Sequence, residues 1–595
     1  MRVADYIAAR VAAHGVRHFF TVTGGGAMHL NDAFARNAAL TGICLHHEQA
    51  CAMAAEAYCR LSGRMALVNV TTGPGGINAL NGVHGAWTDS IAMLIVSGQV
   101  KQETVVSSYD LPLRQLGDQE ADIIAMVRGI TKYAVMLRDK QDVRYVVEQA
   151  LHLAEHGRPG PVWIDVPMDI QGAQIDPETL RGFTPEAAPA LPDITALAEM
   201  LRRAKRPVIM PGTGVRIAGA HADFLRLAGL TQFPVATAFN AHDVLPEEHP
   251  CYVGRPGTVG DRAGNFAVQN ADLVLILGCR LNIRQISYNW ENFAPDAVKI
   301  MVDIDPAELA KPTLQIDIPL LADLKAFIPA LIAELGNFAP SPAALEYLAW
   351  CQARRRRYPV VQPDYADDTH DINPYVFADK LFDAAGETDV IVTANATACV
   401  TTFQAAKLKS EQRMFSNSGA ASMGYDLPAA IGAAWAAPER RIICLSGDGS
   451  FMMNMQELQS IFAQRLNIKI FLLDNAGYSS IRQTQSAFFP DNMFGCDPAS
   501  GVTFPDFGAI AAAFKLPVHR AASHAELPTM LAHVLAAPGP QFCQISLNPA
   551  QVFAPKLSSR KLDDGRMVSS PLHDMAPFLS REELAENIWT QNNDR

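Results

Sequence analysis

Two patterns of apolar and polar residues alternate along the chain. Short runs rich in Val, Ile and Leu are followed by longer stretches in which apolar residues recur at helical spacing. This order is typical of parallel sheets that are covered by helices. The strand candidates form three groups: residues 18–24, 65–73, 92–100 and 160–167; residues 206–212, 271–278 and 298–306; and residues 389–397, 440–449, 468–475 and 540–548.

Two segments interrupt the alternation and divide the chain. Residues 184–193 are rich in Pro and Ala, and residues 337–365 have the composition of a second connector. A chain of 595 residues is also too long for one hydrophobic core. We therefore expect an α/β protein with three doubly wound parallel-sheet domains, over residues 1–183, 194–336 and 366–548, and a C-terminal arm over residues 549–595.

Composition and charge limit the possible partners. Hydrophobic residues make up 49% and charged residues 18% of the chain, a balance typical of globular proteins. The net charge of −12 argues against nucleic acid, because phosphate contacts need a basic face. The sequence has no apolar stretch long enough for a bilayer, no secretory signal pattern at its start, and no C-x-x-C spacing among its ten cysteines. We expect a cytoplasmic protein without nucleic-acid or membrane partners.

The strongest chemical signal is the motif G-D-G-S at residues 447–450, followed 27 residues after Asp448 by Asn475. Asp448 ends one expected strand, residues 450–466 form an expected crossover helix, and Asn475 ends the next strand. Both side chains then emerge at the carboxyl edge of one sheet, where α/β folds bind ligands. A carboxylate, an amide oxygen and a nearby loop carbonyl suit Mg²⁺, and the helix N-terminus suits a diphosphate.

This pattern resembles the diphosphate-and-metal motif of thiamine-diphosphate enzymes, and among them the large subunit of acetolactate synthase. Residues 418–434 resemble the family's segment in which a methionine, here Met423, supports the bent cofactor. His47-Glu48-Gln49 resembles the family's activating glutamate motif. The resemblance implies that Glu48 hydrogen-bonds the pyrimidine ring of the cofactor. Because that glutamate and the metal motif meet across two subunits in the family, it also implies a homodimer or homotetramer with active sites at the subunit interface.

Glycine-rich turns at residues 24–27 and 72–75 and the sequence R-P-G-P at residues 158–161 extend the resemblance to nearly the whole chain. It implies catalytic roles for Glu48, Gly25 and Gln119. It implies metal ligation by Asp448, Asn475 and Gly477. The implied cofactor contacts are Thr72, Met423, Gly447, Asp448, Gly449, Ser450, Asn475, Gly477, Tyr478, Arg158, Gly212, Thr213, Gly214 and Asp303.

The central third of the chain resembles the FAD-binding middle domain of acetolactate synthases, through Gly212-Thr213-Gly214 and Asp303 among other positions. In those enzymes FAD is structural and takes no part in the net reaction. Arg284 aligns with an arginine that holds the carboxylate of the second keto acid. A guanidinium suits a carboxylate, and an ordinary surface arginine is the alternative. The implied cofactors are thiamine diphosphate, Mg²⁺ and FAD.

Several positions depart from biosynthetic acetolactate synthase, and they cluster around the substrate. Asp118 stands where a phenylalanine is usual, Thr484 replaces a tryptophan, and Arg255 replaces a methionine. Residues 396–399 replace a G-Q-H-Q stretch. These changes predict a roomier and more polar acceptor site that suits a hydroxylated acceptor, because buried polar groups need partners. The set resembles acetolactate-synthase-like carboligases of surface-polysaccharide pathways.

The resemblance implies an enzyme that decarboxylates pyruvate and transfers the two-carbon (hydroxyethyl or acetyl) unit to a carbonyl acceptor. Three alternatives stay open: a nucleotide-linked keto-sugar as acceptor in place of a second 2-keto acid, a 2-keto acid decarboxylase, and a flavin-dependent pyruvate oxidase. Intact Glu48, Asp448 and Asn475 argue against a binding protein without turnover. A nicotinamide dehydrogenase is disfavoured because no G-x-G-x-x-G motif opens a helix after a first strand.

Overall fold

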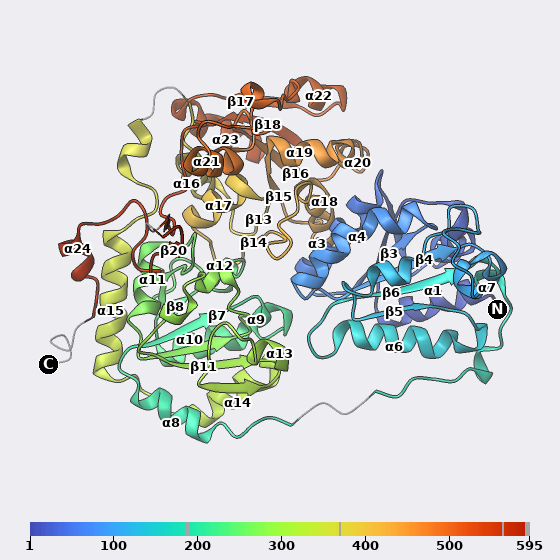
Figure 1. Cartoon of the computed structure of the whole chain (residues 1–595), viewed down its shortest axis with the longest axis horizontal. Coiled ribbons are helices and arrows are strands. Elements are labelled where there is room, and N and C mark those ends of the chain that lie inside the picture. Colours follow the sequence, from blue (N-terminus) through green and yellow to red (C-terminus); the bar gives the residue numbers. More distant parts are fainter. Residues whose placement is uncertain (186–189, 368–370, 562–563, 590–595) are drawn as a thin grey trace.

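The computed structural model of the chain describes residues 1–185, 190–367, 371–561 and 564–589. Three six-stranded parallel sheets, each covered by helices, form an N-terminal, a central and a C-terminal unit. Figure 1 shows them in blue and cyan, in green, and in orange. The predicted fold class, three doubly wound parallel-sheet domains with a C-terminal arm, is confirmed. None of the described helices combines the length and apolar character of a bilayer span.

The N-terminal unit is built on one fully parallel sheet. Its strands are β1 (His18–Thr21), β2 (Thr41–Cys44), β3 (Ala66–Val70), β4 (Met93–Gln99), β5 (Tyr133–Met136) and β6 (Pro161–Pro167), and its helices are α1 (Val3–His14), α2 (Met28–Arg36), α3 (Glu48–Ser62), α4 (Pro74–Thr88), α5 (Ile123–Val127), α6 (Val143–Glu155) and α7 (Met168–Gly172). The strand order is β2-β1-β3-β4-β6-β5. The chain therefore changes direction between β1 and β3, and α/β sheets bind ligands beyond the carboxyl ends at such a switch point.

The C-terminal unit repeats the same topology. Its strands are β13 (Val390–Thr393), β14 (Arg413–Phe415), β15 (Ile442–Gly447), β16 (Ile468–Asp474), β17 (Val518–Ala521) and β18 (Gln541–Ser546), and its helices are α16 (Pro374–Ala384), α17 (Ala396–Ala405), α18 (Asp426–Ala436), α19 (Asp448–Asn454), α20 (Leu458–Ala463), α21 (Ser479–Phe488), α22 (Phe507–Ala513) and α23 (Leu527–Ala536). The order β14-β13-β15-β16-β18-β17 matches the N-terminal sheet strand for strand. Its switch point lies between β13 and β15.

The central unit has a different strand order. Its strands are β7 (Pro207–Pro211), β8 (Val235–Ala236), β9 (Tyr252–Gly254), β10 (Leu273–Leu277), β11 (Val298–Asp303) and β12 (Ile318–Leu321), and its helices are α8 (Thr195–Arg203), α9 (Gly214–Ile217), α10 (His221–Thr231), α11 (Arg262–Gln269), α12 (Ile283–Ile286), α13 (Pro306–Leu309) and α14 (Leu324–Leu335). The order β12-β11-β10-β7-β8-β9 is that of dinucleotide-binding folds, 3-2-1-4-5-6. The crevice for a ligand is then expected between β7 and β10.

Two expectations about the connecting segments are corrected. The connector predicted over residues 337–365 contains helix α15 (Pro342–Arg357), which Ser341 caps through the backbone N–H of Ala344. The helix is stable because Tyr347 and Cys351, one turn apart, are buried against the central core. The single crossover helix predicted over residues 450–466 is broken into α19, a 3₁₀ turn (Met455–Glu457) and α20.

The residues after β18 form an arm that returns to the central unit, as Figure 1 shows in dark red. The arm contains a hairpin of β19 (Ser559–Lys561) and β20 (Met567–Ser569) and the short helix α24 (Arg581–Ala585). The ring of Trp589 lies edge-on to those of Tyr347 and Trp350 in α15, with centroids 5.4 and 5.5 Å apart. The guanidinium of Arg262 donates to the carbonyl of Met575.

The N- and C-terminal units share a continuous apolar core, which positions their sheet edges relative to one another. Helices α3 and α18 lie side by side across this boundary. They approach so closely that a Cβ on Gly432 would lie 1.9 Å from the carbonyl oxygen of Ala54. Only glycine fits there, because the obstacle is backbone and cannot rotate away.

Candidate active site

Asp448 lies at the centre of a preformed cradle at the carboxyl edge of the C-terminal sheet. It follows β15 directly and is buried. Its Oδ1 accepts the backbone N–H of Gly449 at 2.7 Å, and its Oδ2 accepts those of Asn475 at 3.2 Å and Gly477 at 2.9 Å. Burial nevertheless raises the pKa of the Asp448 carboxyl to about 6. A cation bound at this carboxylate would offset the cost of burying its charge.

Asn475 and Gly477 complete an oxygen set on the same side of the cradle. Asn475 is buried at the end of β16, and its amide N–H donates to the carbonyl of Leu473, which directs the other amide atom, Oδ1, away from that carbonyl. Gly477 has a φ of +140°, which places it in a tight turn against the carbonyl of Cys496. A carboxylate, an amide oxygen and a backbone carbonyl are the ligand types that Mg²⁺ prefers.

Met423 and Tyr478 flank the glycine that follows Asp448. A Cβ on Gly449 would lie 3.0 Å from Cε of Met423 and 2.0 Å from Cε1 of Tyr478. Ser450 joins this arrangement, since its hydroxyl accepts the backbone N–H of Gly424 at 2.8 Å. The cofactor and metal residues predicted at positions 423, 447–450 and 475–478 therefore lie together in one cluster.

Glu48 occupies the corresponding edge of the N-terminal unit. It is the first residue of α3 and is half-buried. Its Oε2 accepts a hydrogen bond from the side-chain amide of Asn78 in α4 at 3.0 Å, and its Oε1 would lie 3.4 Å from a Cβ on Gly75. Because residue 75 lacks a side chain, the carboxylate stays accessible at the turn that follows β3.

Gly25, Thr72 and Gln119 gather around the same turn. Gly25 starts the 3₁₀ turn after β1, and a Cβ on the adjacent Gly26 would lie 2.0 Å from Oγ1 of Thr72. That hydroxyl is buried and has no partner among the described residues, so it is free to bind a ligand. The carbonyl of Gln119 packs on Gly73, where a Cβ would lie 1.9 Å away. These residues lie at the β1–β3 switch point of the sheet.

The two clusters are joined within the chain through residues next to Glu48. The backbone N–H of His46 donates to Oε1 of Glu457 at 3.0 Å, and Asn454 donates to Oε1 of Gln49 at 3.4 Å and to the carbonyl of Gly424 at 2.7 Å. Within the described part of the chain, the carboxylate of Glu48 has no hydrogen bond to the C-terminal unit.

A cavity of about 680 Å³ opens at the β7–β10 switch point of the central unit. Six predicted residues line it: Arg158, Gly212, Thr213, Gly214, Asp303 and Arg284. Gly212 and Gly214 let the turn after β7 pack on the backbone of Gly278 after β10, where a Cβ on either would lie within 3 Å of that backbone. The volume lies in the range of cofactor sites.

Charged groups are arranged around this cavity. Asp303 ends β11, and its Oδ1 accepts the backbone N–H of Asp305 at 3.0 Å. Arg158 reaches from the N-terminal unit to Oδ2 of Asp305 at 2.9 Å and Oε1 of Glu308 at 2.7 Å. The guanidinium of Arg284 lies over the ring of Phe239 at 5.0 Å.

Comparison with known proteins decides the family. Models of thiamine pyrophosphate enzymes match residues 1–126 (N-terminal TPP binding domain), 194–331 (central domain) and 396–545 (C-terminal TPP binding domain). Acetolactate synthase isozyme 1 large subunit of Escherichia coli K12 is 31% identical over 93% of this chain and 95% of its own. The chain belongs to the acetolactate-synthase-type thiamine pyrophosphate enzymes.

Other members of this family are equally similar over their length. The acetolactate synthase large subunit of the alga Porphyra purpurea is 32% identical over 90% of this chain and 91% of its own. The probable acetolactate synthase large subunit of Methanocaldococcus jannaschii is 30% identical over 93% of both chains. The protein is thus a thiamine-diphosphate-dependent carboligase of the acetolactate synthase type that acts on small molecules, as the sequence motifs predicted.

Three predicted substrate residues lie apart from the cavity that holds Arg284. Asp118 is exposed on the loop before α5, and Thr484 is exposed on α21, where its hydroxyl donates to the carbonyl of Ser480. Arg255 is buried, and its guanidinium donates to the carbonyls of Gln404 at 3.3 Å and Ala406 at 2.7 Å. Within the chain Arg255 therefore joins the central and C-terminal units, and contact with an acceptor stays a prediction for all three.

Three acidic residues that support the site were not foreseen. Glu120 is buried and accepts the backbone N–H groups of Val106, Leu116 and Gly117, which shapes the loop that carries Asp118 and Gln119. Asp426 accepts from Ser446 and Ser450, and Glu457 accepts from His46. In the sequence, each of these residues is only an acidic residue near a recognised motif. That position does not show whether its carboxylate is buried or solvated.

Proposed function

We propose that this enzyme decarboxylates pyruvate and transfers the two-carbon unit to a carbonyl acceptor. The observation that carries the proposal is the cradle at Asp448, where three backbone N–H groups orient one carboxylate beside the Asn475 amide and the Gly477 turn. Mg²⁺ would be held by the Asp448 carboxylate, the Asn475 amide oxygen and the Gly477 carbonyl. The backbone N–H groups at the start of α19 would hold the diphosphate.

When bound, thiamine diphosphate supplies an electron sink for the decarboxylation of pyruvate. Glu48 would share a proton with the pyrimidine ring, Met423 would support the cofactor, and Thr72 would donate to it with its buried and otherwise unpaired hydroxyl. FAD would occupy the central cavity, with Asp303 accepting from ribose hydroxyls. Gln119 and Gly25 line the approach to the reacting carbon.

For the acceptor we propose a second 2-keto acid, whose carboxylate Arg284 would bind, because the similar proteins are acetolactate synthases. A nucleotide-linked keto-sugar is the second candidate. The observation that favours it is that the polar residues Asp118 and Thr484, which were predicted at the acceptor site, are exposed. Such side chains can pair with sugar hydroxyls at little desolvation cost.

The test is turnover of carbon-13-labelled pyruvate by the purified enzyme with thiamine diphosphate, Mg²⁺ and FAD, following labelled CO₂ and identifying products by mass. Acetolactate formed from pyruvate alone supports the keto-acid acceptor. Slow CO₂ release that accelerates only with a keto-sugar nucleotide supports the second candidate. Free acetaldehyde as main product, or oxygen consumption with flavin bleaching, would overturn the carboligase proposal in favour of a decarboxylase or an oxidase.

We also propose a homodimer in which Glu48 of one subunit serves the cofactor held by Asp448 of the other. Exposed apolar side chains beside both clusters, Ile77, Met452 and Met453, support an interface there. Co-expression of Glu48→Gln and Asp448→Asn subunits tests it, since each variant alone is inactive. Shared sites restore about a quarter of the wild-type activity in a random mixture of dimers. If both residues serve a site within one chain, no mixture regains activity.

A further inference from the structure

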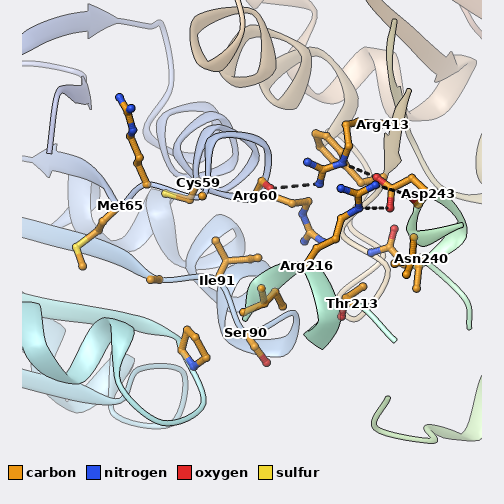
Figure 2. A pocket seen from close by; sticks show the side chains of 18 of the residues that line it. Cys59, Arg60, Met65, Ser90, Ile91, Thr213, Arg216, Asn240, Asp243 and Arg413 are labelled. Atoms are coloured by element: carbon orange, nitrogen blue, oxygen red, sulfur yellow. Dashed lines mark hydrogen bonds and ion pairs between the residues drawn. The ribbon is translucent and has the colours of Figure 1, made fainter. Parts of the chain in front are cut away.

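A second and smaller cavity, of about 230 Å³, lies where the three units meet. Figure 2 shows its lining, which includes Arg60 from the N-terminal unit, Arg216 and Asp243 from the central unit, and Arg413 from the C-terminal unit. It adjoins the larger cavity, because Thr213 and other residues line both. Nothing in the proposed reaction uses it.

Asp243 is held between two arginines from different units. Its Oδ1 accepts from Nε of Arg216 at 3.1 Å, and its Oδ2 accepts from Nε of Arg413 at 2.5 Å. Burial alone would raise the pKa of Asp243, but the two guanidinium groups lower it to about 2. The carboxylate is therefore charged at neutral pH, and so are both arginines. Among Arg216, Asp243 and Arg413 taken by themselves, the charges sum to one positive.

Arg216 and Arg413 each have an N–H group that none of the described residues accepts. Arg216 uses Nε and Nη2 on Asp243, and Arg413 uses Nε on Asp243 and Nη2 on the carbonyl of Arg60. Within the described residues, the Nη1 group of neither arginine has a protein partner. Both side chains remain partly accessible, at 19% and 16% exposure, from the cavity side.

The carboxylates that pair with Arg60, whose carbonyl accepts from Arg413, do not pair with Arg216 or Arg413. The guanidinium of Arg60 is paired with two carboxylates of its own unit, those of Glu56 and Asp89. The hydroxyl of Tyr425 donates to Glu56 at 2.5 Å, which further satisfies that group. Two carboxylates therefore face one guanidinium there, and within the described residues neither of them hydrogen-bonds Arg216 or Arg413.

We propose that this cavity binds a small oxyanion, a carboxylate or a phosphate, between Arg216 and Arg413. Guanidinium groups bind both through paired N–H donors, and a monoanion would accept from the Nη1 groups of Arg216 and Arg413 that have no described protein partner. The volume admits a molecule of this size and excludes a nucleotide, which needs a cavity like the larger one. Bound there, the anion contacts the central and C-terminal units beside the backbone of Arg60. It would thus link the central and C-terminal units next to the larger cavity.

The experiment measures anion binding by titration calorimetry on the full-length enzyme with thiamine diphosphate, Mg²⁺ and FAD, at fixed ionic strength set with chloride. Inorganic phosphate and acetate are the two probes, and their relative affinities distinguish a phosphate from a carboxylate ligand. The variants act on charge in opposite directions. Arg216→Gln removes the excess charge while Arg413 still pairs with Asp243, and Asp243→Asn increases the excess charge.

We expect Arg216→Gln to weaken anion binding about tenfold to a hundredfold, the contribution of one charge-assisted pair, and Asp243→Asn to strengthen it. Arg226→Gln removes the same charge from a surface pair in the same unit and should change nothing. If Asp243→Asn fails to fold, Arg413→Gln must reproduce the loss seen with Arg216→Gln. Binding of neither probe to the wild-type enzyme, or equal affinity in Arg216→Gln and wild type, overturns the proposal.

Discussion

Replacing Gly477 by Ala is predicted to weaken metal and cofactor binding more than it weakens the fold. Gly477 has a φ of +140°, and its N–H donates to Oδ2 of Asp448 at 2.9 Å. A Cβ at this position would lie 2.3 Å from the carbonyl oxygen of Cys496 and 3.1 Å from Cα of Asp497. Because both obstacles are backbone, the turn itself must move and carry its N–H away from Asp448.

Two costs follow from this movement, and they fall on different properties. A left-handed backbone costs a residue other than glycine about 1–2 kcal/mol of folding stability. Loss of a hydrogen bond to a buried carboxylate costs about 1–3 kcal/mol, and this cost falls on the orientation of Asp448. At about 1.4 kcal/mol per factor of ten, we expect the affinity for thiamine diphosphate and Mg²⁺ to fall about tenfold to a hundredfold.

The matched control is Gly501→Ala in the same unit. Gly501 has a φ of +108°, and a Cβ there would meet nothing within 4 Å, so it carries the strain without the displacement. Calorimetric titration of the cofactor, with thermal unfolding of both variants, separates the two effects. The reasoning is refuted if both variants lose cofactor affinity equally, which would assign the effect to strain, or if Gly477→Ala binds as wild type does.

Three further outcomes are expected. Glu457→Gln alters the acceptor of the His46 N–H, and steady-state kinetics should show a kcat about tenfold lower with cofactor affinity unchanged. Ser460→Ala, which removes the hydroxyl that donates to Oε2 of Glu457, should leave kcat unchanged. Burial raises the pKa of Asp165 to about 7, so the folding stability that its uncharged form contributes is full below about pH 4 and is lost as pH rises through 7. Over that range, hydrogen exchange of the amides in β6 should accelerate beyond its intrinsic rate. Asp165→Asn should make this pH dependence flatter. Arg158→Gln breaks its pairs with two carboxylates at the central cavity and should weaken FAD retention about tenfold, measured as flavin absorbance after gel filtration.

The sequence was sufficient for the strands at the centre of each sheet and not for those at the edges. Strands such as β4 and β15 are buried almost throughout and read as unbroken apolar runs. The strands that escaped prediction are short, and most of them, among them β2, β5, β9, β12, β14 and β17, lie at sheet edges; the two-residue β8 is an interior exception. In β12, half-buried and exposed positions alternate, and none of its four residues is fully buried.

The same distinction holds for the site. Asp448 and Asn475 could be found because they follow consecutive buried strands, so their spacing in sequence fixes their closeness in space. Arg255 could be aligned but not placed, since the direction of a long side chain depends on carbonyl groups about 150 residues away. Glu457 was invisible for a similar reason, because its partner His46 lies in another unit.

The three switch points explain why one chain can hold two kinds of cofactor site. The N- and C-terminal sheets share a strand order, and each presents a short glycine-rich turn with a carboxylate, the half-buried Glu48 in one and the buried Asp448 in the other. The central sheet changes direction between β7 and β10, and there the paired turns leave a cavity large enough for a dinucleotide. Arg216 follows the turn after β7, and Arg413 reaches Asp243 beside it only because the central and C-terminal units are packed together. An anion held by Arg216 and Arg413 would therefore depend on the packing of the central unit against the C-terminal unit.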